Sequence, residues 1–223
     1  MKPESYKCDP ILGKEVNDYL DSKGVQTPML ECEVVKDKEK INDISIAFEK
    51  IMETLQLDLS DDSLTQTPYR IGKMFVNELY WGLDYDNFPK GTTVQNKMNY
   101  DEMVVVKDIT SMSTCEHHFV TIDSSCSIAY IPKSTVLGLS KLNRIVEYFS
   151  RRPQIQERLT EQIFYALEYI LGTSDIAVVI NGIHYCVKSR GIEDGASSTI
   201  TSKLGGKFKT EAALRAEFMT IIK

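Results

Sequence analysis

The sequence predicts an α+β protein in which a mainly helical region, residues 1–100, precedes a domain at residues 101–223 built on an antiparallel sheet. Two observations support this class. Apolar residues recur at helical spacing through much of the first half, whereas β-branched runs and amphipathic helices follow the order β-β-α-α-β-β in the second half. The hydrophobic share of 42% and the charged share of 26% are typical of globular proteins.

Two helices are predicted in the first half. The first carries an apolar stripe formed by Ile41, Ile44, Phe48, Ile51, Met52 and Leu55. The second begins with Thr67 as N-cap and Pro68 at the first helical position, and its apolar residues are Ile71, Met74, Phe75 and Leu79. Proline and glycine punctuation at residues 81–91 ends this region.

Strands and helices are predicted in the second half from residue 103 onward. Residues 103–109 and 125–131 are rich in β-branched residues and are expected to be strands. A helix burying Leu142, Ile145, Val146 and Phe149 follows, and then a helix begun by Pro153 and ended by Gly172. The apolar stripe of this second helix is Ile155, Leu159, Ile163, Ala166, Leu167 and Ile170. Strands at residues 176–188 and 197–203 and a helix from Thr210 complete the chain.

Composition and charge exclude several classes of protein. No apolar stretch approaches the roughly 20 residues of a membrane span, and the N-terminus lacks the features of a signal peptide, so a cytoplasmic protein without a membrane partner is expected. The net charge of −6 disfavours a nucleic-acid partner. The odd number of scattered cysteines disfavours a disulfide framework, and Cys8, Cys32 and Cys126 are expected to be small buried hydrophobes.

All three histidines lie within three residues of a cysteine, in the segments CEHH (residues 115–118) and HYC (residues 184–186). The Cys-x-x-His spacing lets one turn direct a sulfur and a nitrogen to one point. The His-x-Cys spacing places both side chains on one face if the segment is a strand, because a strand has a period of two. The two segments together predict a metal site.

Zinc is the metal that such a donor set favours. It takes thiolate and imidazole ligands, and a catalytic zinc site has three protein ligands and one open position. The two segments offer five candidate groups, which would leave two histidines for proton transfer. Four protein ligands would instead make a closed structural site.

A basic cluster offers a site for an anionic substrate. Residues 141–158 contain five basic and two acidic side chains, within an acidic protein. Lys141 and Arg144 share a helix face beside Ser140, and Arg190 follows Cys186 by four residues, on the same side of the strand in the absence of a bulge. A triphosphate needs several convergent cations. The alternative is a solvated charged surface.

Glu157 has two interpretations. A carboxylate near a helix N-terminus is stabilised by the helix dipole, which alone would explain it. A buried carboxylate could also accept two N–H bonds from the Watson–Crick edge of guanine. The pattern does not choose between them.

The combined motifs closely resemble the GTP cyclohydrolase I family. The segments that carry the resemblance are CEHH, YIPKSTVLGLSKLNRIV, RRPQIQERLT and HYCVKSRG, with TPYR and GLDYDNFPK in the helical half. The resemblance covers roughly residues 40–222 and departs from the family pattern at none of the site positions.

The resemblance implies a role for each site residue. Cys115, His118 and Cys186 would be the zinc ligands, and His117 and His184 the acid/base groups. Glu157 would recognise guanine, with Gln156 beside it. The contacts on the triphosphate side would be Ser140, Lys141, Arg144 and Arg190, with Arg70 supplied by a neighbouring subunit.

The resemblance also implies the tunnelling fold, an antiparallel sheet with two helices on one side, and assembly into a homodecamer of two stacked pentamers. The reaction that it implies is conversion of GTP to formate and 7,8-dihydroneopterin triphosphate, at the start of folate or pterin biosynthesis. Two rival functions remain open. One is a structural zinc domain that binds a nucleotide or a protein without catalysis. The other is a tunnelling-fold enzyme, such as a reductase, that acts on another purine or pterin.

Overall fold

The computed structural model describes residues 1–30 and 35–223. The chain forms two compact units, which we call the helical unit (Met1–Lys2 and Pro28–Trp81) and the sheet unit (Pro3–Thr27 and Gly82–Lys223). Within the described parts of the chain, none of the helices combines the length and apolar character needed to cross a membrane.

The helical unit is built on two packed helices, α2 (Asp37–Thr54) and α3 (Thr67–Met74), with a π turn at Phe75–Leu79. Both predicted helices are present. The start of α3 differs by one residue, because Thr67 is already helical and Gln66 occupies the N-cap without a side-chain hydrogen bond. Close packing explains Gly72, where an added Cβ would lie 2.5 Å from the carbonyl oxygen of Ile41 on α2.

The sheet unit contains a five-stranded sheet in the order β5-β2-β3-β6-β7. Its neighbouring strands are antiparallel except for β5, which runs parallel to β2. The strands are β2 (Val104–Cys115), β3 (Thr121–Tyr130), β5 (Pro153–Gln154), β6 (Ile176–His184) and β7 (Thr199–Leu204). A separate antiparallel pair joins β1 (Thr93–Gln95) to β4 (Thr135–Leu137). The predicted mixture of helices with an antiparallel sheet is confirmed.

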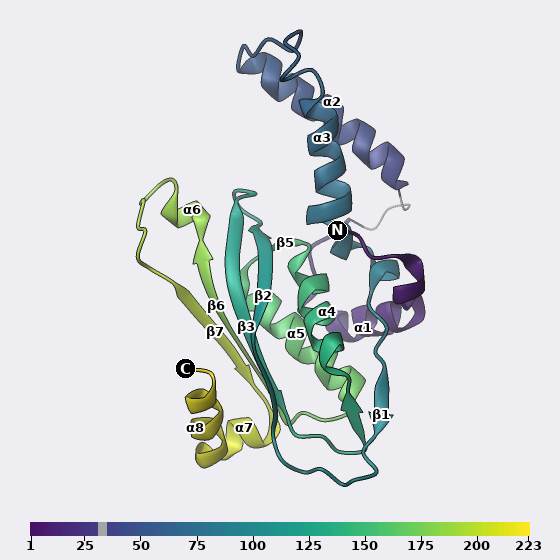
Figure 1. The fold of residues 1–223 in the computed structure, drawn as a ribbon, viewed down its shortest axis with the longest axis vertical. Coiled ribbons are helices and arrows are strands. Elements are labelled where there is room, and N and C mark those ends of the chain that lie inside the picture. Colours follow the sequence, from purple (N-terminus) through teal and green to yellow (C-terminus); the bar gives the residue numbers. More distant parts are fainter. Residues whose placement is uncertain (31–34) are drawn as a thin grey trace. The chain divides into compact units, whose positions relative to one another are not determined.

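Two amphipathic helices, α4 (Leu139–Ser150) and α5 (Gln156–Leu171), cover one face of the sheet (Figure 1). Helix α1 (Pro10–Ser22) packs against α5. The apolar stripes of α4 and α5 are buried as their periodicity predicts, at Leu142, Ile145, Val146, Phe149, Leu159, Ile163, Ala166 and Leu167. Full burial of one large apolar side chain contributes roughly 1.5–3 kcal/mol, so this layer is a main source of stability.

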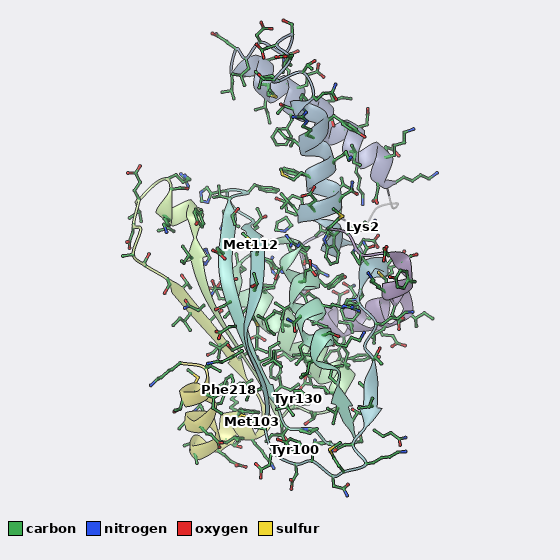
Figure 2. The ribbon with its side chains drawn as sticks, in the orientation of Figure 1. Lys2, Tyr100, Met103, Met112, Tyr130 and Phe218 are labelled. Carbon is green, nitrogen blue, oxygen red and sulfur yellow. The ribbon has the colours of Figure 1, made fainter. Side chains whose placement is uncertain are left out.

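The opposite face of the sheet is covered near the C-terminus by α7 (Gly206–Thr210) and α8 (Ala212–Ile221) (Figure 1). Phe208 and Phe218 are fully buried there, with ring centroids 5.7 Å apart. Met103 packs against the same cluster, and Figure 2 labels both Met103 and Phe218. The C-terminal helix was predicted to begin at Thr210, and this start is wrong. Thr210 is the last residue of α7, and α8 begins at Ala212.

Other boundaries differ from the prediction as well. Strand β2 ends at Cys115, six residues beyond the expected strand end at residue 109, and β3 begins at Thr121, four residues before the expected start at residue 125. Pro153 belongs to β5, and α5 begins three residues later at Gln156. The strand expected at residues 176–188 ends at His184, where the short helix α6 (Tyr185–Lys188) takes over. Cys186 therefore lies on a helical turn.

The remaining cysteines follow the prediction where the structure describes them. Cys8 and Cys126 are buried, and Cys126 is fully inaccessible in the core. Burial raises the pKa of the Cys126 thiol well above its usual range, so this group stays neutral. Cys32 lies outside the described residues.

Candidate active site

The CEHH segment forms the tight connection between β2 and β3. Cys115 is the last residue of β2, and its N–H donates to the carbonyl of Val120 at 2.8 Å. The N–H of Phe119 donates back to the carbonyl of Cys115 at 2.8 Å, and Phe119 has a positive φ of 53°. This closed turn keeps the side chains of residues 115–118 close together in space.

Three side chains meet beside this turn. The ligand atoms of Cys115, His118 and Cys186 all lie within 4.8 Å of one another, and the Cys115 Sγ to His118 Nδ1 distance is 4.0 Å. In a tetrahedral zinc site with Zn–S near 2.3 Å and Zn–N near 2.0 Å, neighbouring ligand atoms are about 3.5–3.8 Å apart. Small side-chain adjustments would bring the three groups into that geometry, so the residues fit a metal ion.

The electrostatics of Cys186 reflect its position beside Cys115. Burial raises the pKa of the Cys186 thiol, and the neighbouring Cys115 raises it further, while Arg190 has the opposite effect. The first two effects favour the neutral thiol. A cation bound at this site would lower the pKa of the thiol and favour the thiolate.

Of the two remaining histidines, His117 lies beside this group and His184 lies two residues before Cys186 in the chain. His117 places Nδ1 at 3.9 Å from the Cys115 sulfur. His184, the last residue of β6, lies with Nε2 at 2.8 Å from the side-chain oxygen of Gln156. Burial lowers the pKa of His184, and Glu157 partly opposes this shift. All five of the predicted metal-binding and proton-transfer groups therefore lie on β2, β6 and the turns that follow them.

A comparison with known proteins decides the family. The family model described as GTP cyclohydrolase I matches residues 44–223. The chain belongs to the GTP cyclohydrolase I family.

Curated relatives support this membership over nearly the whole chain. The chain is 54% identical over 208 residues to GTP cyclohydrolase 1 of Serratia proteamaculans (strain 568), which covers 93% of this chain and 94% of the relative. It is 53% identical over 218 residues to GTP cyclohydrolase 1 of Enterobacter sp. (strain 638), covering 96% and 98%. The predicted resemblance is confirmed, and with it the prediction that the chain is an enzyme.

A solved structure of an archaeosine synthase QueF-Like, in its apo form, superposes with a TM-score of 0.35 and 19% sequence identity. It covers 47% of this chain and 93% of that one, a likeness too slight to bear on the fold.

The predicted triphosphate residues lie on two elements of the sheet unit. Ser140, Lys141 and Arg144 occupy the first two turns of α4, where Ser140 is exposed and the two cations are half-buried. Arg190 is exposed just after α6, so its expected place on the same strand as Cys186 is wrong. Strand β6 ends at His184, so Cys186 and Arg190 are separated by the helical turn of α6 and not by a stretch of strand.

The other basic residues counted in the cluster have partners inside the protein. Arg152 is buried, with its guanidinium 4.6 Å from the centroid of the Tyr148 ring, and it donates to Thr27 at 3.1 Å. Arg151 lies 3.7 Å from Glu147. Arg158 is paired with Glu116. Of the five cations in residues 141–158, Lys141 and Arg144 are therefore the candidates for binding a ligand.

The two residues predicted to lie near the guanine base, Gln156 and Glu157, are the first two residues of α5. Glu157 is exposed in its first turn, a position that the helix dipole favours for a carboxylate. Gln156 is 2% exposed and turns its side chain inward. Arg70 lies exposed on α3 of the helical unit.

One ion pair at the site was missed from the sequence. Arg158 on α5 makes a two-pronged contact with Glu116, the residue between Cys115 and His117, at 2.6 and 3.2 Å. The hydrogen bond from Arg158 lowers the pKa of Glu116, although burial acts against this shift. The N–H of Glu116 also donates to the carbonyl of Gln154 at 3.1 Å, so the turn is fixed from both sides. The sequence signal that could have indicated this ion pair is the acidic residue inside the CEHH motif.

Proposed function

We propose that this enzyme opens the imidazole ring of GTP at C8, releases formate and rearranges the product to 7,8-dihydroneopterin triphosphate, the first step of tetrahydrofolate or pterin biosynthesis. The observation that carries the proposal is the convergence of the ligand atoms of Cys115, His118 and Cys186 within 4.8 Å, with His117 beside Cys115 and His184 at the end of β6, two residues before Cys186. Family membership supports GTP as the substrate.

Zinc is the metal that the donor set supports, because two sulfurs and one imidazole nitrogen suit its ligand preference. Cys115, His118 and Cys186 would hold it. When bound, zinc supplies a Lewis acid that can lower the pKa of a water molecule from about 16 to near 7. Three protein ligands leave one position of a tetrahedral site open, which favours a catalytic site over a closed structural one.

His117 and His184 would supply the proton transfers. The aromatic purine is a poor electrophile at C8, so a proton must reach the imidazole ring of the base as a nucleophile adds. Histidine titrates in the range where one side chain can donate that proton and later accept another. His117 is exposed and His184 half-buried, so the two differ in their access to solvent.

Substrate recognition in the proposal uses residues from several elements. Glu157 would accept two N–H bonds from guanine, with Gln156 adjacent. Ser140, Lys141 and Arg144 would approach the triphosphate from α4 and Arg190 from the segment after α6. Arginine offers two-pronged geometry to phosphate oxygens, which fits this role.

We further propose that residues 101–223 form the catalytic domain in a tunnelling fold, preceded by the helical region of residues 1–100. In this arrangement the enzyme assembles as a homodecamer of two pentamers, and Arg70 reaches the site of a neighbouring subunit. The free edges of a sheet are unpaired in a single chain, and assembly would give them partners.

The test is to incubate the zinc-loaded protein with GTP or ATP, and to measure formate together with a fluorescent pterin after mild oxidation. We expect both products from GTP and neither from ATP. Formate without pterin would limit the activity to ring opening. Neither product, from a protein that holds zinc and is assembled, would favour a structural zinc domain, whereas turnover of another purine or pterin would favour the second rival.

A further inference from the structure

The side-chain amide of Gln156 is held inside the sheet unit. Its nitrogen Nε2, which carries two hydrogens, lies within hydrogen-bond distance of three acceptors: the carbonyl oxygens of Ile180 and Thr199 at 3.1 and 2.8 Å, and the hydroxyl oxygen of Thr201 at 3.1 Å. These partners lie on the neighbouring strands β6 and β7, while Gln156 is the first residue of α5. The amide therefore ties the start of a helix to two strands.

These partners determine which way the amide faces. A backbone carbonyl can only accept a hydrogen bond, so the NH₂ end must face Ile180 and Thr199. A flipped amide would place its oxygen against two carbonyl oxygens. The neighbouring hydroxyl groups are consistent with this orientation of the amide. The Thr160 hydroxyl donates to the backbone carbonyl of Gln156 at 2.8 Å, and it lies 2.7 Å from the hydroxyl oxygen of Thr201. Thr201 can then donate to Thr160 while it accepts from Gln156.

With the nitrogen fixed in this way, the oxygen Oε1 faces His184. It lies 2.8 Å from His184 Nε2, and an amide oxygen only accepts. His184 must therefore carry its proton on Nε2. Gly182 makes room for this contact, because a Cβ at that position would lie 2.4 Å from Oε1.

We infer that Gln156 is a positioning residue for His184: by accepting from Nε2 it fixes the orientation of the imidazole ring and the tautomer whose Nδ1 is unprotonated. The inference rests on the proposed acid–base role of His184. It replaces a direct contact between the Gln156 side chain and the guanine base, because both ends of the amide already have partners inside the protein.

The first test needs no variant. The zinc-loaded protein is labelled with ¹⁵N at histidine, and the imidazole nitrogens are observed by magic-angle-spinning NMR. The chain has only three histidines, and loss of a signal in His184→Ala assigns that residue. We expect neutral His184 to show a protonated Nε2 and an unprotonated Nδ1. The reverse pattern would overturn the inference.

The second test compares three variants. Gln156→Met removes the acceptor at similar side-chain length, and Gly182→Ala displaces the oxygen without deleting it. Thr201→Val is the matched control, because it removes one partner of the amide nitrogen but leaves both carbonyls in place. Removing the outer hydrogen-bond partner of a metal-ligating histidine typically costs about 10–100-fold, and we expect a similar factor for His184.

We expect kcat to fall about 10–100-fold in Gln156→Met and Gly182→Ala, with KM for GTP and zinc content close to wild type. Thr201→Val should keep kcat within about threefold. A raised KM with unchanged kcat in Gln156→Met would return Gln156 to substrate binding and refute the positioning role. Equal losses in all three variants would reduce Gln156 to a structural residue.

Failure of this inference can be separated from failure of the proposed function. If the wild-type protein releases no formate from GTP, the proposed function fails, whatever the NMR spectrum shows. If it releases formate but His184 is protonated on Nδ1, only the role of Gln156 is refuted.

Discussion

The contact between Arg158 and Glu116 gives the sharpest structural prediction outside the metal ligands. Replacing Arg158 with Met keeps most of the apolar stem and removes the cation, so Glu116 is left without its partner beside the metal-binding turn. The two side chains are 15% and 23% exposed. Breaking a buried ion pair costs about 3–5 kcal/mol, and an exposed one contributes less than about 1 kcal/mol. For this intermediate burial we expect Arg158→Met to lower the free energy of unfolding by about 2 kcal/mol.

The same substitution should weaken metal binding, because Glu116 lies between Cys115 and His117 in the turn. Loss of an outer-shell contact typically weakens metal affinity by 10–100-fold, and we expect about tenfold here. The assays are urea unfolding at fixed protein concentration and competition for zinc with a chromophoric chelator.

The matched control is Lys203→Met. Lys203 pairs with Glu161 at 2.8 Å, with side chains 28% and 33% exposed, away from the CEHH turn. We expect this variant to lose about 1 kcal/mol and to bind zinc as the wild type does. If Arg158→Met also kept wild-type zinc affinity, the ion pair would contribute to folding alone, and its proposed support of the metal turn would be wrong.

Five other substitutions test separate parts of the structure. Cys186→Ala should abolish stoichiometric zinc binding, measured by elemental analysis; a variant that retained one zinc per chain would refute the ligand set. His117→Ala and His184→Ala should each keep zinc and the fold but lose about 10²–10⁴-fold in turnover of GTP, and loss of zinc would show that a ligand had been mistaken for an acid/base group. Glu157→Gln should weaken GTP binding in calorimetry, because an amide places a donor where guanine also donates, and unchanged affinity would leave Glu157 as a helix-start residue. Phe208→Ala, at a fully buried position, should cost about 3–5 kcal/mol in urea unfolding without changing zinc content, and a loss below 1 kcal/mol would contradict its place in the core.

The elements that could be predicted from the sequence are those with a strong local signal. Helices α4 and α5 were predicted because their apolar residues repeat with helical period, and Gly172, with a φ of 61°, ends α5 as expected. Helix α1 was missed, although Asp9 caps it through a bond from Leu12 and Pro10 follows at the first helical position. That pair of residues was a usable signal.

The site shows where local patterns stop being informative. Residue type and spacing predicted a metal site in the CEHH and HYC segments, and the family resemblance selected Cys115, His118 and Cys186, whose ligand atoms the structure places together. The expected reason was partly wrong, since Cys186 lies on α6 and not on the strand that ends at His184. A change from strand to helix at one residue depends on tertiary packing, which a period of two cannot reveal.

Long-range polar contacts could not be predicted at all. Arg158 and Glu116 are 42 residues apart, and from the sequence Arg158 was counted in the basic cluster of residues 141–158 with no partner named. Gln156 reaches strand residues 24 and 43 positions away, so its burial could not be predicted from its place at a helix start. Both contacts form only once α5 packs on the sheet.

Zinc titration of the metal-free enzyme tests the proposed activity most directly. Formate release from GTP is measured as zinc is added in steps, with bound zinc quantified at each step. We expect formate release to rise in proportion to bound zinc and to reach its plateau at one zinc per chain. Full formate release from the metal-free protein, or stoichiometric zinc binding without formate, would contradict a catalytic zinc at Cys115, His118 and Cys186.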